Sequence, residues 1–322
     1  MRFFYETGSN NANRNKFFAQ GNIEELLSSF IKNCVVLSNE EKLIKQLSTI
    51  AQDGHQQLQI ISDFDYTITK YIDGGQRMLT THEAIEMHPN MKKRSISELR
   101  KLRDIYLPIE MSCVKDPVIL RQHMDLWWNQ SYSILLANPV TRRMIVEVEQ
   151  FAPIVFRQEF TDFAAYLRSV WIPLTVFSAG LGDVIAQLMQ SAHMSMENVL
   201  IAANYMQFGR NDVAYAFAKP IICVHNKTLQ ILKQPASILT NRSEQLTRRN
   251  VMLLGDSPHD VHMTNGHDFN TVLKIGFLNQ PTSQSIEQYK QIYDMVLTKH
   301  ESFRVPLNLI KWICTFPKSL FK

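Results

Sequence analysis

Apolar residues follow two patterns along the chain, one at helical spacing and one in short uninterrupted runs. Between residues 21 and 50, apolar side chains from Ile23 to Leu47 recur three and four positions apart, which predicts two short helices. Asp53-Gly54 breaks this pattern. The run Leu58–Ile61 that follows predicts a short buried strand.

The helical pattern dominates from about residue 78 to 170. Pro139 is expected to begin one helix, and residues 156–170 are expected to form another. A longer helix is predicted from apolar residues at helical spacing: Met124, Trp127, Trp128, Tyr132, Leu135 and Leu136.

Strands and helices alternate in the remainder of the chain. Strands are predicted at 172–177, 198–202, 251–254, 272–275 and 295–297, and helices at 180–191, from about 258, at 283–293 and at 303–314. This alternation predicts an α/β fold, a Rossmann-like doubly wound parallel sheet. The helical block between its first two strands is expected to be an inserted cap.

Four parts of the chain are therefore expected. Residues 7–20 are rich in Asn, Gly and Ser, so residues 1–20 are predicted to be a flexible N-terminal tail. The core is expected to be formed by residues 21–77 and 160–322, with a helical cap at 78–159.

Composition narrows the class of protein. The chain has 322 residues and a formal charge of +4 without a dense cluster of Lys and Arg, so no nucleic-acid partner is expected. No segment approaches the ~18 apolar residues of a membrane span, and the N-terminal apolar run is too short for a signal peptide. Four widely spaced cysteines, without a C-x-x-C pair, predict neither a zinc site nor a disulfide framework. A cytoplasmic protein that acts as a monomer is expected.

Two carboxylates follow the first predicted strand of the core. Asp63 and Asp65 are two residues apart, and burying both is costly unless a cation or a reaction requires them. Mg²⁺ prefers such oxygen ligands. One carboxylate could attack phosphorus, and the other could protonate the leaving alcohol and later activate water. The alternative is a polar turn with solvated aspartates.

Three further segments lie near predicted strand ends, the edge of an α/β sheet where ligands bind. Ser178 precedes small residues at a helix N-terminus, which suits a phosphate oxygen but also an ordinary helix cap. Lys227 could balance the charge of a transferred phosphoryl group, although a lone lysine is usually solvated. Asp256 could complete a metal site, and Asp260 could hold a metal-bound water or the lysine; the alternative is an Asp/Gly turn.

The ordered set D-x-D-x-T, Ser, Lys and G-D-x-x-x-D resembles the haloacid dehalogenase (HAD) superfamily, whose core is a Rossmann-like sheet with an inserted cap. From about residue 21 the chain is more closely similar to the cytosolic 5′-nucleotidase III family, the pyrimidine and 7-methylguanosine phosphate nucleotidases. The stretches that carry this resemblance are 59–65, 176–184, 224–227 and 273–279.

The resemblance implies a role for each site residue. Asp63 would be the nucleophile and Asp65 the acid/base. Mg²⁺ would be held by Asp63, Asp65 (through its backbone carbonyl) and Asp256. The phosphate would be bound by Ser178, Ala179 and Lys227.

The chain departs from this family at two places. His259 stands where the family usually has Gly, which would change access near the metal. The segment 208–219 does not follow the family's usual sequence, so a remodelled hairpin is expected there. Neither departure removes a chemical group.

The resemblance places the base-binding positions at Glu110, Trp128 and Ser131. A carboxylate accepts hydrogen bonds from the amine of cytosine or guanine and repels the carbonyl edge of uracil. An indole stacks on any base and binds the cationic 7-methylguanine ring more strongly. We therefore expect 7-methylguanosine and cytidine monophosphates as substrates. Trp127 is expected to be cap core instead.

Three functions follow from these residues. The leading one is hydrolysis of nucleoside 5′-monophosphates through an aspartyl-phosphate, with Mg²⁺ as cofactor. The second is a HAD phosphatase that acts on a non-nucleotide phosphate ester. The third is a catalytically silent nucleotide-binding module. Transfer of the phosphate to another alcohol is a further possibility, because an aspartyl-phosphate reacts with any alcohol that reaches it.

Overall fold

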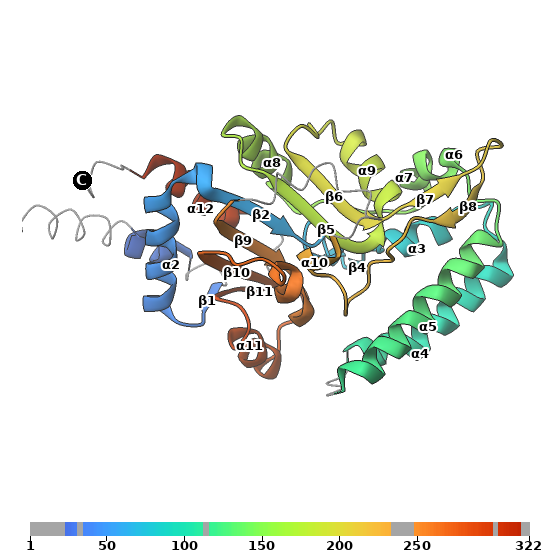
Figure 1. Ribbon diagram of the computed structural model, residues 1–322, viewed down its shortest axis with the longest axis horizontal. Helices are drawn as coiled ribbons and strands as arrows, with labels where there is room; N and C mark the ends of the chain where they lie inside the picture. Colours follow the sequence, from blue (N-terminus) through green and yellow to red (C-terminus); the bar gives the residue numbers. More distant parts are fainter. Residues whose placement is uncertain (1–22, 31–34, 112–115, 233–247, 299–301, 317–322) are drawn as a thin grey trace, which may run out of the picture.

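Seven strands form one sheet through the middle of the molecule (Figure 1). The computed structural model describes residues 23–30, 35–111, 116–232, 248–298 and 302–316, so the predicted tail lies outside the described residues. The strands, in their order across the sheet, are β1 (Val35–Leu37), β11 (Met295–Thr298), β10 (Thr271–Leu278), β9 (Asn250–Gly255), β2 (Leu58–Ser62), β5 (Leu174–Leu181) and β6 (Val199–Asn204).

All neighbouring strands in this sheet run parallel except β1, which is antiparallel to β11. Alternate residues of the central strands enter different cores. Ile60 and Met252 belong to the larger cluster, whereas Ile61 and Val251 belong to the smaller one on the other face. Both faces are thus buried, as parallel strands require, and the predicted α/β fold is confirmed.

Helices supply the two layers that cover the sheet. The larger cluster takes apolar residues from α2 (Glu40–Asp53), α8 (Phe160–Ser169), α9 (Gly182–Ser191) and α12 (Arg304–Thr315). The smaller cluster takes them from α10 (Leu229–Leu232), the 3-10 helix η3 (Pro258–Thr264) and α11 (Ser283–Lys290). This is the three-layer arrangement expected from alternating strands and helices.

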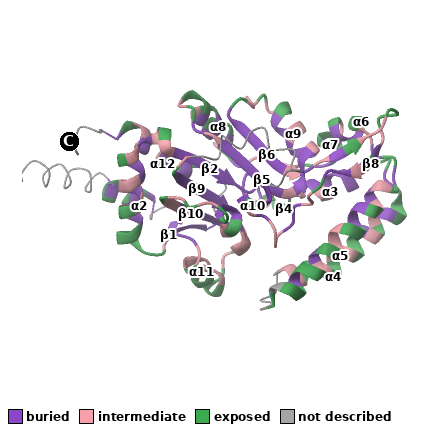
Figure 2. Ribbon diagram, viewed as in Figure 1, coloured by how far each residue is buried: buried purple, intermediate pink, exposed green. Residues whose placement is uncertain are grey.

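Five helices lie between β2 and α8 in the described part of the chain. They are α3 (Thr81–Glu86), α4 (Lys93–Met111), α5 (Pro117–Leu136), α6 (Arg142–Val146) and α7 (Val148–Phe151). The helices α4 and α5 pack side by side and project away from the sheet (Figure 1). The strands are mostly buried, whereas this helical pair is largely exposed or half-buried (Figure 2). The predicted cap boundaries at 78 and 159 stay a prediction.

Two small hairpins accompany the sheet: β3 (Ile72–Asp73) with β4 (Gln76–Arg77), and β7 (Met206–Phe208) with β8 (Ala214–Phe217). The second lies where a remodelled hairpin was expected. It joins the helical block, because Tyr132 of α5 stacks on Phe217 with 3.8 Å between ring centroids. An isolated bridge between Thr141 and Val213 adds a backbone contact.

Several predicted elements differ in the structure. Residues 21–50 do not form two helices alone: residues 23–30 are helical, but β1 intervenes before α2. A strand of three residues is too short to show a recognisable alternation of apolar and polar positions. The helix predicted at 156–170 begins only at Phe160, because Phe156 bridges Thr69. Pro139 begins no helix; Thr141 caps α6 instead.

In the described part of the chain, no helix is long and apolar enough to cross a membrane.

Candidate active site

Three acidic side chains meet where β2 and β9 end. Asp63 follows β2, and its backbone N–H donates to the carbonyl of Leu254 in β9 (3.0 Å). Asp256 follows β9, and Asp260 lies one helical turn later in η3. Carboxylate oxygens of these three residues lie within 4.8 Å of one another. Parallel register brings these strand ends together, as the sequence predicted.

Lys227 lies between Asp63 and Asp260. Its ammonium donates to Asp63 Oδ1 (2.5 Å) and to Asp260 Oδ1 (2.8 Å). The other oxygen of Asp260 accepts the backbone N–H groups of Asp256 (3.1 Å) and Ser257 (2.9 Å). Asp260 therefore holds the lysine, which is one of the two roles that the sequence left open for it.

Burial controls the charge of these acids. It raises the pKa of Asp63 to about 6, although the Lys227 ammonium acts in the opposite direction. Burial, then the Asp63 and Asp260 charges, also hold the pKa of Asp256 well above its usual range. The carboxylates of Asp63 and Asp260 both contact the single ammonium of Lys227, so one negative charge is left over. A bound cation would offset this charge.

Asp65 faces away from this group and towards the start of α3. Its Oδ1 accepts the backbone N–H of Thr81, and its Oδ2 accepts the Thr81 hydroxyl, both at 3.0 Å. Burial and the nearby Asp63 charge raise the pKa of Asp65 to about 7, against the hydrogen bonds from Thr81. The carboxyl group can therefore carry a proton at neutral pH, as a general acid must.

A β-bulge re-aims the chain after Phe177 in β5. Ser178 is buried, and its oxygen accepts the backbone N–H of Gly180 (2.9 Å). A Cβ atom at Gly180 would clash with the Thr81 hydroxyl and lie 3.0 Å from Asp65 Oδ2. The carbonyl of Ala179 is fixed by the Asn204 side chain (2.7 Å). Glycine at position 180 thus lets the backbone after Ser178 approach Thr81 and Asp65 closely.

A network that the sequence did not reveal supports the loop after β2. Arg157 is buried and donates to the carbonyls of Tyr66 (2.6 Å) and Thr67 (2.8 Å). It also donates to Asn279 Oδ1 (2.6 Å), while the Asn279 amide donates to Asp256 Oδ2 (3.3 Å). Arg157 thereby connects the loop that carries Asp65 to the acid cluster. No local pattern marks a single arginine for this position.

The donors fit a hard divalent cation. Carboxylate oxygens are the ligands that Mg²⁺ prefers, and Asp63, Asp256 and Asp260 offer one oxygen each within a small volume. Asp256 is held by two weak contacts, from the Thr67 hydroxyl and the Asn279 amide at 3.3 Å each. Its charge is therefore only partly compensated. This group can hold a divalent metal ion.

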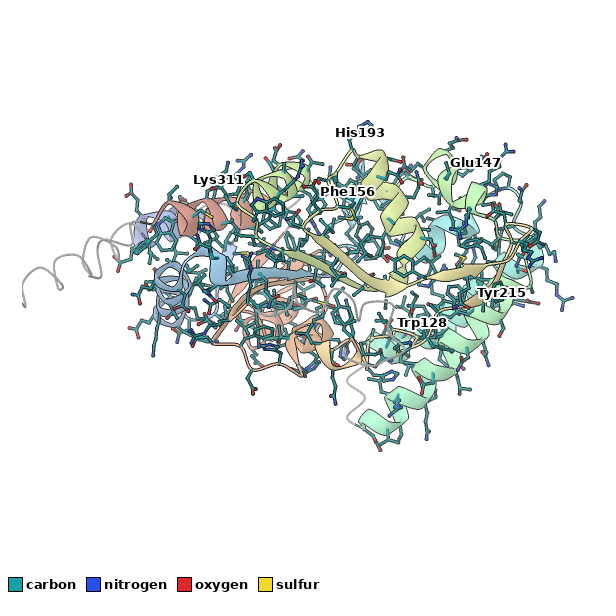
Figure 3. All side chains as sticks on the ribbon, turned by 45° about the horizontal axis from the view of Figure 1, so that its top comes forward. Trp128, Glu147, Phe156, His193, Tyr215 and Lys311 are labelled. Atoms are coloured by element: carbon teal, nitrogen blue, oxygen red, sulfur yellow. The ribbon has the colours of Figure 1, made fainter. Side chains whose placement is uncertain are left out.

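The predicted base-binding residues lie on the helical pair. Glu110, near the end of α4, is close enough to Lys227 and Asp260 to interact electrostatically with both. Burial raises the pKa of Glu110 to about 7. Trp128 of α5 is half-buried and packs against the larger core cluster, at the side of the helix that faces the rest of the molecule (Figure 3). Ser131, one turn further, is 7% exposed.

Trp127 and Trp128 have different surroundings, and Trp127 packs within the cap as expected. Trp127 is half-buried, and its ring stacks between Tyr106 of α4 and Trp128, with centroids 5.9 and 5.7 Å apart. It thus joins the two cap helices, whereas Trp128 is the tryptophan that reaches the core cluster. Adjacent residues on a helix point in directions about 100° apart, so only one of them can face the core.

This chain matches the family model described as pyrimidine 5′-nucleotidase (UMPH-1) over residues 66–314. The chain belongs to this family. It is 30% identical to the 7-methylguanosine phosphate-specific 5′-nucleotidase of Mus musculus over 293 residues, 90% of this chain and 95% of the relative. The chicken protein of the same name is 29% identical over 284 residues, 88% of this chain and 96% of the relative.

Solved structures show the same fold. Cytosolic 5′-nucleotidase IIIB, crystallised with cytidine, superposes with a TM-score of 0.77 at 24% sequence identity, covering 89% of this chain and 95% of that structure. A HAD family hydrolase from Salmonella enterica gives a TM-score of 0.51 at 12% identity and covers 79% and 71%. The family match shows that the chain is a phosphoric monoester hydrolase of the 5′-nucleotidase family. The similarity to the solved structures shows that its core has a HAD-like fold.

His259, which the resemblance marks as a departure from the family, contacts the helical pair. It lies in η3 between Asp256 and Asp260, is half-buried, and hydrogen-bonds the backbone of Glu110. Burial lowers the pKa of His259, which favours the neutral imidazole. A glycine could not make this contact, so His259 is an added link between the acid cluster and the end of α4.

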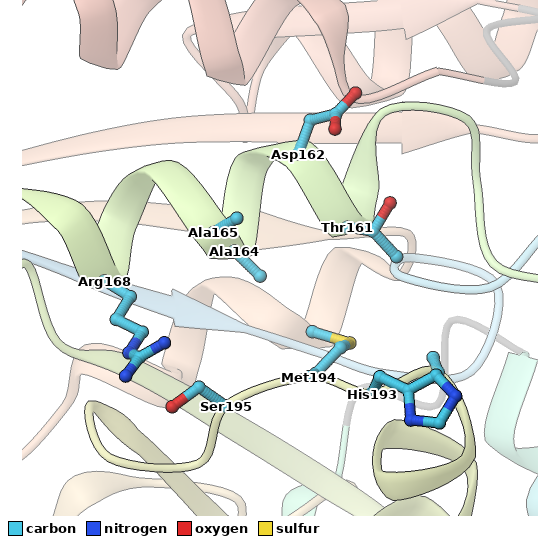
Figure 4. A pocket seen from close by; sticks show the side chains of 9 residues that line it. Thr161, Asp162, Ala164, Ala165, Arg168, His193, Met194 and Ser195 are labelled. Carbon is cyan, nitrogen blue, oxygen red and sulfur yellow. The ribbon is translucent and has the colours of Figure 1, made fainter.

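A separate hollow lies on the side of α8 (Figure 4). It has a volume of about 420 Å³. Thr161, Ala164, Ala165 and Arg168 of α8 line one wall, and the turn at 193–195 lines the other. None of the residues predicted for catalysis, phosphate or base contributes to it. The hollow thus lies apart from the predicted site residues.

Proposed function

We propose that this chain hydrolyses the 5′-monophosphates of 7-methylguanosine and cytidine, with Asp63 as nucleophile. One observation carries the proposal. The cluster of Asp63, Asp256, Asp260 and Lys227 lies at the carboxyl edge of a parallel sheet, and Glu110 of the helical cap is within electrostatic reach of it. The residue proposed to recognise the base thus lies near the residues proposed to cleave the phosphate ester.

Asp63 attacks the phosphorus, and the leaving ribose 5′-oxygen takes a proton from Asp65. The pKa of Asp65, raised to about 7 by burial, suits both this step and the later deprotonation of water. Thr81 holds the carboxyl group through two hydrogen bonds, so its orientation does not depend on substrate. Water then hydrolyses the aspartyl-phosphate and regenerates Asp63.

We propose Mg²⁺ as the cofactor, held by Asp63, Asp256 and the backbone carbonyl of Asp65. When bound, the ion supplies positive charge to the phosphoryl oxygens. The excess negative charge of the acid cluster and the all-oxygen donor set support this choice.

The phosphate is proposed to lie against Ser178, Ala179 and Lys227. The Ser178 oxygen accepts from Gly180, so its own hydrogen remains able to donate to a phosphate oxygen. Lys227 is kept cationic by Asp260 and Asp63, although burial opposes the charge. The Ser178 hydroxyl thus offers a hydrogen-bond donor, and Lys227 offers positive charge, to the phosphoryl oxygens on which negative charge develops.

The base is proposed to bind against Trp128, with Glu110 and Ser131 at its edge. Three buried polar atoms in this area lack a hydrogen-bond partner among the described residues: Trp128 Nε1, Tyr132 Oη and His82 Nε2. Their rings lie together, with His82 4.8 Å and Tyr132 5.5 Å from Trp128. Buried polar atoms are normally satisfied, so a polar ligand or ordered water is expected there.

The relatives agree with this substrate class by name only: several are called 7-methylguanosine phosphate-specific, and one structure contains cytidine. A Caenorhabditis elegans relative is named a putative cytosolic 5′-nucleotidase, and we propose a cytosolic, monomeric enzyme here as well.

A substrate panel tests the proposal. Phosphate release is measured with the monophosphates of 7-methylguanosine, cytidine, uridine and adenosine, with and without Mg²⁺, on the wild type and Glu110→Ala. We expect Mg²⁺-dependent release, fastest with the first two substrates, and a loss of that preference in the variant. Equal wild-type rates for the cytidine and uridine nucleotides would remove the role of Glu110. No release from any nucleotide would overturn the function.

A further inference from the structure

Three potential metal ligands meet between the helical cap and the core, and none of them belongs to the acid cluster. Cys223 and His225 lie in the segment between β8 and α10, and Asp125 lies in α5. Cys223 Sγ is 3.2 Å from His225 Nδ1 and 3.7 Å from His225 Nε2, and the latter nitrogen is 3.6 Å from Asp125 Oδ1. The three donor atoms lie within 4.8 Å of one another.

These spacings suit a tetrahedral ion. With zinc-ligand bonds of about 2.0–2.3 Å, ligand atoms around one ion are about 3.4–3.6 Å apart. The two distances to His225 Nε2 are close to this range without any rearrangement of the segment. Three protein ligands leave a fourth position open to water.

The donor set suits a borderline-soft cation. Cys223 offers a sulfur atom, His225 an imidazole nitrogen and Asp125 a carboxylate oxygen. Sulfur and imidazole ligands together are typical of zinc sites.

The cysteine spacing gave no indication of a metal site, because Asp125 is about a hundred residues away from the other two ligands in sequence. The fold supplies this third ligand. Cys223 is only 2% exposed, whereas the Asp125 side chain is 51% exposed, so an ion can enter from the cap side.

We propose that Asp125, Cys223 and His225 bind Zn²⁺ at a site separate from the Mg²⁺ site. On binding, the thiol proton is released to solvent as the sulfur–zinc bond forms, and no oxidant or reductant is involved. Thiolate and imidazole select a borderline-soft ion over Mg²⁺, whereas the all-carboxylate cluster favours the hard ion.

Zinc at this position links the parts of the molecule that carry the two halves of the active site. Asp125 lies three residues before Trp128 on α5, and His225 lies two residues before Lys227. An ion that bridges Asp125 and His225 holds the cap against the core and slows product release. This consequence rests on the proposed function, whereas the binding does not.

Cobalt(II) absorption tests the binding directly, because a cobalt–thiolate bond gives a charge-transfer band. The full chain, freed of metal and kept in excess Mg²⁺, is titrated with Co²⁺, and Zn²⁺ then displaces it. We expect one ion per chain with a thiolate band in the wild type. The band should be lost in Cys223→Ser, and affinity should fall at least about tenfold in Asp125→Asn and His225→Asn.

Two matched controls use residues outside the site. Cys314→Ser changes another thiol, and His193→Asn changes an exposed imidazole; neither should alter the titration. A thiolate band that persists in Cys223→Ser would overturn the site. Unchanged affinity in Asp125→Asn would also overturn it, and this exposed position leaves little room for a folding defect.

Activity tests the consequence. Micromolar Zn²⁺ in excess Mg²⁺ should lower nucleotide turnover in the wild type several-fold. It should leave Asp125→Asn unaffected, and without zinc this variant is expected to turn over like the wild type. Equal inhibition of both proteins would show that zinc acts at the acid cluster. It would contradict the proposal that zinc at Asp125 and His225 holds the cap against the core. If the chain released no phosphate from nucleotides at all, the cobalt titration would still decide the site.

Discussion

The acid site of the core and the aromatic group around Trp128 in the cap satisfy their polar groups to different degrees. In the core, Asp260, Asp65 and Arg157 each make at least two hydrogen bonds with backbone or side-chain partners. In the cap, Trp128 Nε1 and Tyr132 Oη are buried without a partner among the described residues. The groups proposed for catalysis are thus preorganised, whereas the proposed base site leaves polar atoms for a ligand to satisfy.

This difference has a physical reason. A reaction centre works best when its donors are oriented before the charge develops, so no reorganisation is needed in the transition state. A pocket that recognises a base must instead leave donors and acceptors free for it. The two regions should therefore respond differently to substitution.

Removal of Arg157 should have the largest effect on the preorganised region. Arg157→Ala deletes three hydrogen bonds to the loop after β2 and to Asn279. We expect the free energy of unfolding to fall by about 2–4 kcal/mol and kcat to fall at least tenfold. Denaturant unfolding and steady-state kinetics measure both. Arg168→Ala, an exposed arginine of α8, is the control and should change little; equal effects would contradict the role of the network.

The Asp65 carboxylate should reduce stability at neutral pH. Its pKa in the folded protein is about 7 against an ordinary value of 3.8, so the folded state binds the proton more tightly than the unfolded chain. Stability is therefore lost as pH rises from about 4 to about 7. In metal-free buffer, Asp65→Asn should be more stable than the wild type by about 1–2 kcal/mol at pH 8.

The comparison with low pH tests this assignment. At pH 4 the two proteins should have similar stability, because the wild-type carboxyl group is protonated in both states. Asp162→Asn, at an exposed position of α8, controls for the loss of a negative charge. A wild-type protein that gained stability between pH 4 and pH 8 relative to Asp65→Asn would contradict the burial of Asp65.

In the cap, Trp128→Ala should affect binding rather than chemistry. Loss of stacking is expected to raise KM for cytidine monophosphate about tenfold, since stacking contributes about 1–3 kcal/mol per base. KM for a small ester such as p-nitrophenyl phosphate should barely change. Trp171→Ala, which alters a tryptophan 63% exposed, is the control. An equal rise for both substrates would place Trp128 outside the base site.

The smallest effect concerns the protonation of Glu110. Below about pH 7 the carboxyl group is protonated and can pair with either cytosine or uracil; above it, the carboxylate repels the uracil carbonyl edge. The ratio of kcat/KM for cytidine over uridine monophosphate should thus rise a few-fold between pH 6 and pH 8. Glu110→Gln should show no such rise. A ratio independent of pH in both proteins would exclude Glu110 from base selection.

The sequence predicted the core better than its surroundings. Val251–Leu254 is an uninterrupted apolar run, and Leu58–Ile61 is interrupted only by Gln59. Both lie in buried parallel strands, and an aspartate directly follows each strand. The acids were found because strand ends share one edge of a sheet. The strand β1 was missed because an edge strand of three residues, paired antiparallel, leaves no periodic pattern.

Residues that act through distant contacts could not be found in this way. Arg157 meets Thr67 across ninety positions of sequence, and Thr81 meets Asp65 across sixteen. Neither residue belongs to a local motif. Asp125 meets His225 only because α5 packs beside the segment that carries Lys227. Such pairs depend on how the cap sits on the core, which periodicity does not specify.

The central claim is that Asp63 carries the phosphoryl group during turnover. The direct measurement mixes the enzyme with cytidine monophosphate and Mg²⁺, quenches it in acid, reduces it with borohydride and locates the modified residue by mass spectrometry. We predict that Asp63 is converted to homoserine, the product of a reduced aspartyl-phosphate, and that Asp63→Asn gives neither this product nor measurable turnover. Modification at Asp65 or Asp256 instead, or wild-type turnover by Asp63→Asn, would contradict the account.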